Sequence, residues 1–340
     1  MISNIKSCDK CPICGSNRFT PLFQVPFPNF SSTKIGQGGF PLDKTVDVPT
    51  WVIVKCEDCS VRYPNPFPTK KEISDYYALK VEPIDCEIEH YIEVPLEERL
   101  QRDRLVEQLE ILNGLPGSLL EIGPAAGWLL WAAKNRGWKV YGVEASPKFH
   151  KYAAGVLKLP VMLGTLEKMD LEGDNKYDVV VMMDVIEHLY DPIFDLKKVR
   201  KIISDKGFLV ITTGDMDSGC ARFYGLNWRH IIISHVFYWT KPPMFHALQR
   251  AGFRVERFSE PRYWHPNPCL EYLYHIREIG KFIARILLRV SYVPLSRLFP
   301  SIRHAVAAVT RGRLSHKKLM YRIGDQPVLG DVMFVVARPL

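Results

Sequence analysis

The sequence predicts an α/β protein with a doubly wound, Rossmann-like sheet of seven strands and a small N-terminal domain held by metal-binding cysteines. Three observations lead to this prediction. From Ser118 onward, short apolar segments of strand length alternate with segments of helical periodicity, the order typical of a mostly parallel sheet with helices on both faces. The first of these strands runs into a glycine-rich turn that opens a helix. Two Cys-x-x-Cys pairs precede the alternating region.

Local patterns place each element in order. A charged helix over 95–113 carries leucines near helical spacing and is closed by Gly114. Ser146 is expected as the N-cap of the helix that begins at Pro147, and Gly252 ends the last helix of the alternating region. The expected strands are the short, mostly apolar runs Leu119–Ile122, Lys139–Val143, Val161–Leu163, Asp178–Met183, Phe208–Thr213, Phe253–Phe258 and Val332–Ala337. The expected helices between them are Trp128–Arg136, Pro147–Val156, Asp191–Ile203 and Lys241–Ala251.

Composition places the chain among ordinary globular proteins. It has 340 residues, of which 47% are hydrophobic and 24% charged, so extensive disorder is excluded and one large domain with additions, or two domains, is expected. No apolar run is long enough to cross a membrane, and the N-terminus lacks the apolar core of a secretory signal. A cytoplasmic location is therefore expected, where paired cysteines indicate metal ligands or redox thiols more than disulfides.

Four regions are expected along the chain. They are an N-terminal module over 1–68, the alternating domain over 69–262, an insertion over 263–326 and the last strand of the sheet over 327–340. Charge is uneven among them, because residues 241–340 hold 17 Lys and Arg against 6 Asp and Glu in a chain whose net charge is +8. Such a basic segment is expected to meet an anion or to be a solvated face.

Within the insertion, residues 276–290 are expected to form a basic amphipathic helix, with aliphatic side chains on one face and Arg and Lys on the other. Three roles stay open for this helix. It could contact an anionic membrane, which would place the protein at the inner membrane surface, or it could bind a phosphorylated acceptor. The third role is to pack its apolar face on the sheet. Nucleic acid is a disfavoured partner, because the basic residues are not interleaved with stacking aromatics. The sequence predicts no oligomeric state.

A glycine-rich turn lies between the first strand and its helix, within the run from Leu120 to Gly127. Glycine is needed where a side chain would collide with a ligand or with the packed helix, so the backbone can approach a ligand at the carboxyl edge of the sheet. Glu144 ends the next strand, where its carboxylate can accept hydrogen bonds from both hydroxyl groups of a ribose. Together these features predict a nucleoside-containing ligand, and either NAD or S-adenosylmethionine fits them.

Three motifs resemble those of the class I S-adenosylmethionine-dependent methyltransferases, in particular their small-molecule branch of sugar and quinone enzymes. The motifs are Glu-x-Gly-x-x-x-Gly from Glu121, the pair Val143-Glu144, and the segment Tyr177–Leu189. In that family the first acid lies near the methionine part of the cofactor, the second holds the ribose, and residues after the third strand contact adenine. The resemblance implies S-adenosylmethionine as cofactor, with binding roles for Glu121, Gly123, Ala125, Gly127, Glu144, Thr165, Leu166 and Asp184. Ala125 replaces the middle glycine of the family's loop, which is the smallest side chain that could intrude there.

Two cysteine pairs are expected to hold a zinc ion. Their members are Cys11, Cys14, Cys56 and Cys59. Two Cys-x-x-Cys knuckles can place four thiolates tetrahedrally around zinc, and the metal supplies folding free energy that so small a module lacks. A redox role is the alternative, but neither pair opens a helix as a thioredoxin-like site does. Cys8 could compete as a ligand. With Tyr63-Pro64-Asn65-Pro66 behind the second pair, the arrangement resembles the zinc-binding domain that covers the active site of certain sugar methyltransferases.

Two histidines are candidate general bases. His235 follows the fifth strand in a segment similar to the His-x-x-Tyr/Phe-Phe-Ser/Thr motif of sugar methyltransferases, where the histidine is a candidate base. Ile232 and Ser234 stand where the C-methylating members have tyrosine and glutamate, which weakens the case for C-methylation by their mechanism and leaves O- and N-methylation at least equally open. His188 is the rival, because it follows the fourth strand directly. His235 is the preferred candidate of the two.

The expected function is therefore S-adenosylmethionine-dependent methyl transfer to a small-molecule or glycan acceptor, with nucleotide-linked or polymer-linked sugars as the leading class. Two alternatives stay open. One is methylation of RNA or protein, with the zinc module gripping the polymer. The other is a zinc-stabilised binding protein without catalysis, against which the presence of both Glu121 and Glu144 argues.

Overall fold

The computed structural model describes residues 10–26, 50–71, 73, 96–169, 176–232, 234–259 and 331–340. The chain divides into two compact units, Met1–Pro261 with Gly330–Leu340, and Arg262–Leu329. The second unit lies outside the described residues, and so do Cys8 and the expected helix over 276–290. The predicted bounds of the four regions stay predictions.

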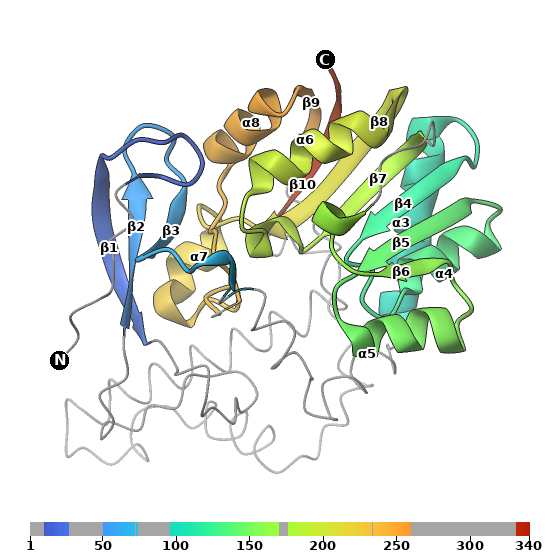
Figure 1. Ribbon diagram of the computed structural model, residues 1–340, viewed down its shortest axis with the longest axis horizontal. Helices are drawn as coiled ribbons and strands as arrows, with labels where there is room; N and C mark the ends of the chain where they lie inside the picture. The colour runs from blue at the N-terminus through green and yellow to red at the C-terminus, as the bar shows by residue number, and fades with distance from the viewer. Residues whose placement is uncertain are drawn as a thin grey trace, which may run out of the picture. The chain divides into compact units, whose positions relative to one another are not determined.

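The main sheet has seven strands, which confirms the predicted fold class (Figure 1). The strands are β4 (Ser118–Ile122), β5 (Lys139–Glu144), β6 (Val161–Leu163), β7 (Tyr177–Met183), β8 (Ile203–Gly214), β9 (Phe253–Ser259) and β10 (Val332–Pro339). Their order is β6-β5-β4-β7-β8-β10-β9. All neighbours from β6 to β8 pair in parallel, whereas β10 runs antiparallel to both β8 and β9. The order of the strands therefore reverses at β4, where β5 and β7 diverge to either side.

The central strands are buried along their length. Leu119 and Leu120 of β4 are fully inaccessible to solvent, and β7 and β8 present continuous runs of buried Val, Ile, Leu and Phe. Parallel strands that helices cover on both faces have this composition, because neither side of the strand meets water. The apolar runs that made these strands predictable are therefore the centre of the core.

Helices connect the strands. They are α3 (Leu96–Asn113), α4 (Trp128–Asn135), α5 (Pro147–His150), α6 (Pro192–Ile202), α7 (Gly219–Tyr224) and α8 (Lys241–Arg250). As expected, the side chain of Ser146 caps α5, which continues as a π-helix over Lys151–Val156. Helix α3 packs on α4 and α6 packs on α8, and Figure 1 shows α6 and α8 next to each other. Helix α7 was not expected; Ser218 caps it by accepting a hydrogen bond from the N–H of Ala221, 3.0 Å away.

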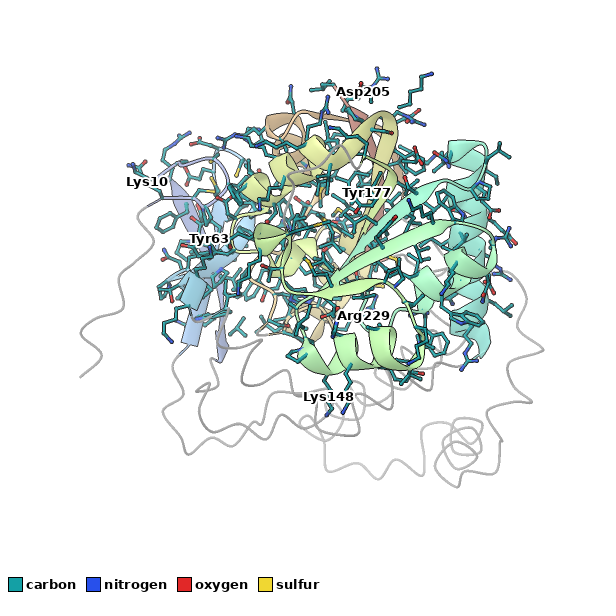
Figure 2. All side chains as sticks on the ribbon, turned by 45° about the vertical axis from the view of Figure 1, so that its right-hand side comes forward. Lys10, Tyr63, Lys148, Tyr177, Asp205 and Arg229 are labelled. Atoms are coloured by element: carbon teal, nitrogen blue, oxygen red, sulfur yellow. The ribbon has the colours of Figure 1, made fainter. Side chains whose placement is uncertain are left out.

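The N-terminal module forms a second, antiparallel sheet of three strands, β1 (Phe19–Pro26), β2 (Thr50–Cys56) and β3 (Arg62–Asn65). Pro64 pairs with Ile53 inside β3. Because β3 is an edge strand, one side of it needs no hydrogen-bond donor and tolerates a proline. Figure 2 labels Tyr63 on this strand and Tyr177 at the start of β7 in the main sheet.

The two sheets share one apolar core. Buried residues of the module, among them Ile13, Val54 and Tyr63, belong to the same cluster as the buried residues of the main sheet. A backbone bridge joins Arg62 of β3 to Tyr238, whose N–H donates to the carbonyl of Arg62 at 2.9 Å. No helix among the described residues is long and apolar enough to cross a membrane.

Candidate functional site

The loop after β4 has the backbone shape that its glycines allow. Gly123 and Gly127 have φ values of 69° and 86°, in the left-handed region. A Cβ on Gly123 would lie 2.7 Å from Val185, and one on Gly127 would lie 2.7 Å from Leu159. Both positions thus need glycine for conformation and for packing. Ala125 also has a left-handed φ of 48°, so this alanine adopts the strained conformation of the glycine that it replaces.

Glu144 ties this loop to the end of β5. One carboxylate oxygen accepts a hydrogen bond from the N–H of Ala125 at 2.9 Å, and the other accepts from the N–H of Ser146 at 2.7 Å. Burial raises the pKa of Glu144, while these two N–H groups act in the opposite direction. Each carboxylate oxygen can accept a further hydrogen bond. The residue therefore has the acceptor capacity that a ribose requires.

Glu121 lies one strand away, inside β4, and is only 4% exposed. Its Oε2 atom has no hydrogen-bond partner among the described residues. Burial is the main cause that raises the pKa of Glu121 to about 8, and the nearby Glu144 carboxylate acts in the same direction, while the positive charge of Arg102 acts against them. A buried carboxyl oxygen without a hydrogen bond is costly, so this position favours a ligand that brings a positive charge or a hydrogen-bond donor.

The other predicted cofactor residues also lie at the carboxyl ends of strands. Thr165 and Leu166 follow β6, and Asp184 follows β7 with a left-handed φ of 52°. Loops at this edge of an open α/β sheet are where such folds bind ligands, beside the point at which the strand order reverses. The structure thus brings all eight predicted residues to one edge. Their individual binding roles stay predictions.

Four cysteines meet in the N-terminal module. The sulfur atoms of Cys11 and Cys59 are 3.6 Å apart, those of Cys14 and Cys56 are 3.5 Å apart, and all four lie within 4.8 Å of one another. None of the four forms a disulfide. Sulfurs arranged tetrahedrally around zinc, with Zn–S bonds of about 2.3 Å, are about 3.8 Å apart. Donor type and spacing therefore fit zinc, whose presence stays a prediction.

The two cysteine pairs have the same backbone geometry. Gly15 donates from its N–H to the carbonyl of Cys11, and Ser60 donates from its N–H to the carbonyl of Cys56. Both Gly15 and Ser60 have left-handed φ values, 79° and 64°. Each knuckle thus closes in the same tight turn and directs its two thiols to one point.

The two candidate bases lie against each other, with ring centroids 4.6 Å apart. His188 Nδ1 is 2.8 Å from the carbonyl oxygen of Ser234, and His235 Nδ1 is 2.8 Å from that of His230. A carbonyl can only accept, so each Nδ1 carries the proton and each Nε2 the lone pair. Burial lowers the pKa of His188 to about 4 and that of His235 well below its usual range, so both rings are neutral near pH 7.

The surroundings of the two rings differ. His235 is 6% exposed, and its Nε2 faces Glu187 Oε1 at 4.0 Å. His188 is half-buried. Glu187 and His230 were not predicted as site residues, although Glu187 lies within the Tyr177–Leu189 motif. Both are buried beside His235, and no short-range sequence pattern connects residues so far apart in the chain.

The N-terminal module contacts the segment that carries His235. Phe67, just after β3, lies 5.2 Å from the ring of Phe237 and 5.9 Å from that of Tyr190. Arg62 donates a hydrogen bond to Asp217 at 2.7 Å, besides its backbone bridge to Tyr238. The module therefore braces the loops that follow β7 and β8.

Comparison with known proteins identifies the domain. Residues 90–257 match the family described as a methyltransferase domain. A ubiquinone biosynthesis O-methyltransferase of a Caulobacter strain is 33% identical over 100 residues, which are 28% of this chain and 40% of the relative. The enzyme of the same name from Acinetobacter baumannii is 23% identical over 193 residues, 50% of this chain and 81% of that protein. The chain thus spans well under half the length of the first of these relatives.

Solved structures of methyltransferases are also similar. One is a possible histamine N-methyltransferase from Thermotoga maritima, 18% identical, with a TM-score of 0.47 over 78% of this chain and 99% of that chain. The family match covers β4 to β8 and the loops that carry Glu121 and Glu144. Residues 90–257 therefore form an S-adenosylmethionine-dependent methyltransferase domain, built on the Rossmann-like seven-stranded sheet described above.

Proposed function

We propose that the protein transfers a methyl group from S-adenosylmethionine to a small-molecule acceptor. The observation that carries this proposal is the cradle at the carboxyl edge of the sheet, where Gly123 and Gly127 leave no room for side chains and two buried glutamates stand at adjacent strand ends. The residues fit the cofactor. Glu144 would accept from the ribose hydroxyls, and Glu121 would face the methionine part, whose ammonium group would satisfy its unpartnered oxygen.

When bound, S-adenosylmethionine supplies a methyl group that its sulfonium already activates. The protein's own residues then have two tasks, to position the acceptor and to take up one proton. Asp184 lies past the end of β7, the position at which cofactor and acceptor would meet. Positioning also depends on the loop after β8, which Phe67 and Arg62 hold from the side of the module.

We infer that His188 is the better placed proton acceptor, which reverses the preference drawn from the sequence. Its Nδ1–H is held by the carbonyl of Ser234, so Nε2 carries the lone pair, and the ring is half-buried. His235, by contrast, is 6% exposed, and its Nε2 faces Glu187. An acceptor hydroxyl must come within about 3.2 Å of the base.

For the acceptor we propose a sugar-linked substrate, with O-methylation as the reaction. The similarity to ubiquinone biosynthesis O-methyltransferases supports a small acceptor and an oxygen nucleophile. Support for a sugar comes from the four-cysteine module, which resembles the domain that covers the active site of certain sugar methyltransferases. A zinc ion held by Cys11, Cys14, Cys56 and Cys59 would keep that module folded, a structural task outside the methyl transfer.

The test is transfer of labelled methyl groups from S-adenosylmethionine to two panels, nucleoside-diphosphate sugars and phenolic acceptors. Transfer to a sugar is expected, and His188→Gln should lower turnover by about 100-fold or more while leaving cofactor affinity unchanged. Transfer to phenols alone would refute the sugar assignment and keep the reaction. Labelling of RNA or protein, with a strong dependence on salt for RNA, would refute a small-molecule acceptor.

A further inference from the structure

A buried cluster outside the cofactor cradle joins Glu187, His230 and His235. One candidate ligand atom from each residue lies within 4.8 Å of the other two. All three side chains are more than nine-tenths buried, Glu187 at 1%, His235 at 6% and His230 at 8% exposed. Glu187 belongs to the short 3-10 helix Ile186–His188 after β7, whereas both histidines belong to the loop between α7 and α8.

Within this cluster, the carboxylate of Glu187 is unusual because it is buried without a hydrogen bond from the part of the chain that the structure describes. Neither of its oxygens has a hydrogen-bond partner among the described residues. The Thr213 hydroxyl and the residue's own N–H act on it electrostatically, but neither meets the geometry of a hydrogen bond. The charged neighbour that acts on it is Asp184, another carboxylate. A buried carboxylate in this position needs a proton or a cation.

His235 presents the matching donor atom. The carbonyl of His230, 2.8 Å from Nδ1, takes the ring proton, so the lone pair of Nε2 faces Glu187 Oε1 at 4.0 Å. This distance is too long for a hydrogen bond. It does suit two ligands of one metal ion, because bonds of about 2.0–2.2 Å place ligand atoms up to about 4.2 Å apart. Holding Nδ1–H on a backbone carbonyl is also how proteins orient a metal-binding histidine.

The basic side chain of Arg229 lies near the cluster but is already paired with Asp331. Arg229 donates two hydrogen bonds to Asp331, at 2.7 and 2.9 Å, and Asp331 is 3% exposed. Figure 2 labels Arg229, which directly precedes His230 in the chain. The guanidinium therefore compensates Asp331, and the cluster of Glu187 with two imidazoles is left as a compact set of oxygen and nitrogen donors.

We propose that Glu187, His230 and His235 bind a divalent transition-metal ion, as a second metal site besides the four cysteines. Two imidazoles and one carboxylate select ions of the zinc, cobalt and ferrous class over magnesium and calcium, which prefer oxygen ligands. The ion would fasten the loop between α7 and α8 to the end of β7. In this arrangement His235 is a ligand, and proton acceptance is left to His188.

The test counts metal ions in the full chain after loading with Zn²⁺ and removal of the excess. Two ions per chain are expected in the wild type, and one in Glu187→Gln and in His235→Gln. Glu121→Gln, which changes an equally buried carboxyl group outside the cluster, should keep both. Cys14→Ser should keep the ion at Glu187.

Reconstitution with Co²⁺ separates the two sites by spectroscopy. The four-cysteine site gives thiolate-to-cobalt charge-transfer absorption, which Glu187→Gln should leave unchanged while removing one equivalent of cobalt. A single ion in the wild type overturns the proposal, and so does a second ion that survives both Glu187→Gln and His235→Gln. The number of metal ions bound by the wild-type protein tests the proposal by itself. The proposal therefore stays falsifiable even if a variant fails to fold. The count is independent of any methyl transfer.

Discussion

The carboxylate of Glu144, at the end of β5, accepts a hydrogen bond from the backbone N–H of Ala125, 2.9 Å away in the loop after β4. The residue predicted to hold the ribose thus also holds the glycine-rich loop in place. Ala125 donates this hydrogen bond from a left-handed backbone conformation, with a φ of 48°, which costs an alanine about 1–2 kcal/mol. The loop geometry therefore depends on a hydrogen bond that offsets backbone strain.

Ala125→Gly should release that strain. Glycine adopts the same φ freely but loses about 0.4–1 kcal/mol through its more flexible unfolded state, so a net gain in unfolding free energy of up to about 1.5 kcal/mol is expected. Ala126→Gly is the matched control. Ala126 is 2% exposed and has no positive φ, so the same change should destabilise the protein by about 0.5–1 kcal/mol. Urea unfolding of both variants measures this; a loss of stability in Ala125→Gly would contradict the strain argument.

Glu121 should make stability depend on pH in the cofactor-free protein. Its pKa is raised from 4.5 to about 8 by burial, so the folded state keeps the proton over a pH range in which the unfolded state has lost it. The associated stability is fully present below about pH 4.5 and is lost as pH rises toward about 8. Glu121→Gln cannot titrate, so its unfolding free energy should fall less between these values. Glu107→Gln, at an exposed residue, should show the same pH dependence as the wild type. If the unfolding free energies of the wild type and of Glu121→Gln fell equally with rising pH, the titration of a buried Glu121 would be refuted.

Loss of one cysteine should unfold the N-terminal module. Cys14→Ser is expected to lower the melting temperature and to release zinc at chelator concentrations that the wild type withstands, because metal binding supplies the folding free energy of such modules. Cys220→Ser changes a buried cysteine outside the four-cysteine group and should leave that zinc in place. Thermal unfolding with and without chelator checks this. If a strong chelator left the melting temperature of the wild-type protein unchanged, structural zinc would be excluded.

The pair Arg229–Asp331 should contribute more to stability than any exposed ion pair. Asp331 is 3% exposed, whereas the Arg229 side chain is 46% exposed, so Arg229→Met leaves a buried carboxylate that keeps the hydrogen bond from Trp228 but loses its counterion, at a cost of about 1.5–3 kcal/mol. Arg338→Met removes the pair with Glu256, whose side chain is half-exposed, and should cost at most about 1 kcal/mol. Denaturant unfolding of the two variants compares them. Similar losses would contradict the burial argument.

The main sheet was predictable because its strands are buried on both faces and bounded by glycine and proline. The expected run Lys139–Val143 differs from β5 by one residue, whereas β8 begins at Ile203, well before the expected Phe208. Its early residues Asp205 and Lys206 are exposed, so the apolar pattern that identifies a buried strand is missing there. Helix α7 was missed because six residues are too few for a helical period to show.

The N-terminal sheet and the histidine cluster show the limits of local patterns. Strands β1 and β3 contain prolines, which argue against a strand unless it lies at an edge, and that position is known only once the strands are paired. The four cysteines were found because their spacing is itself a metal-binding pattern. Glu187 and His230 have no such spacing. They meet only because the loop between α7 and α8 returns to the end of β7.

The most direct test of the account is a calorimetric titration of the protein with S-adenosylmethionine. One site per chain is expected. Glu144→Ala should abolish binding, because it removes both the ribose acceptor and the hydrogen bond to Ala125, while Glu107→Ala, at an exposed glutamate of α3, should bind as the wild type does. If the folded wild-type protein bound no S-adenosylmethionine, the proposed methyl transfer would be contradicted, because the reaction requires this methyl donor.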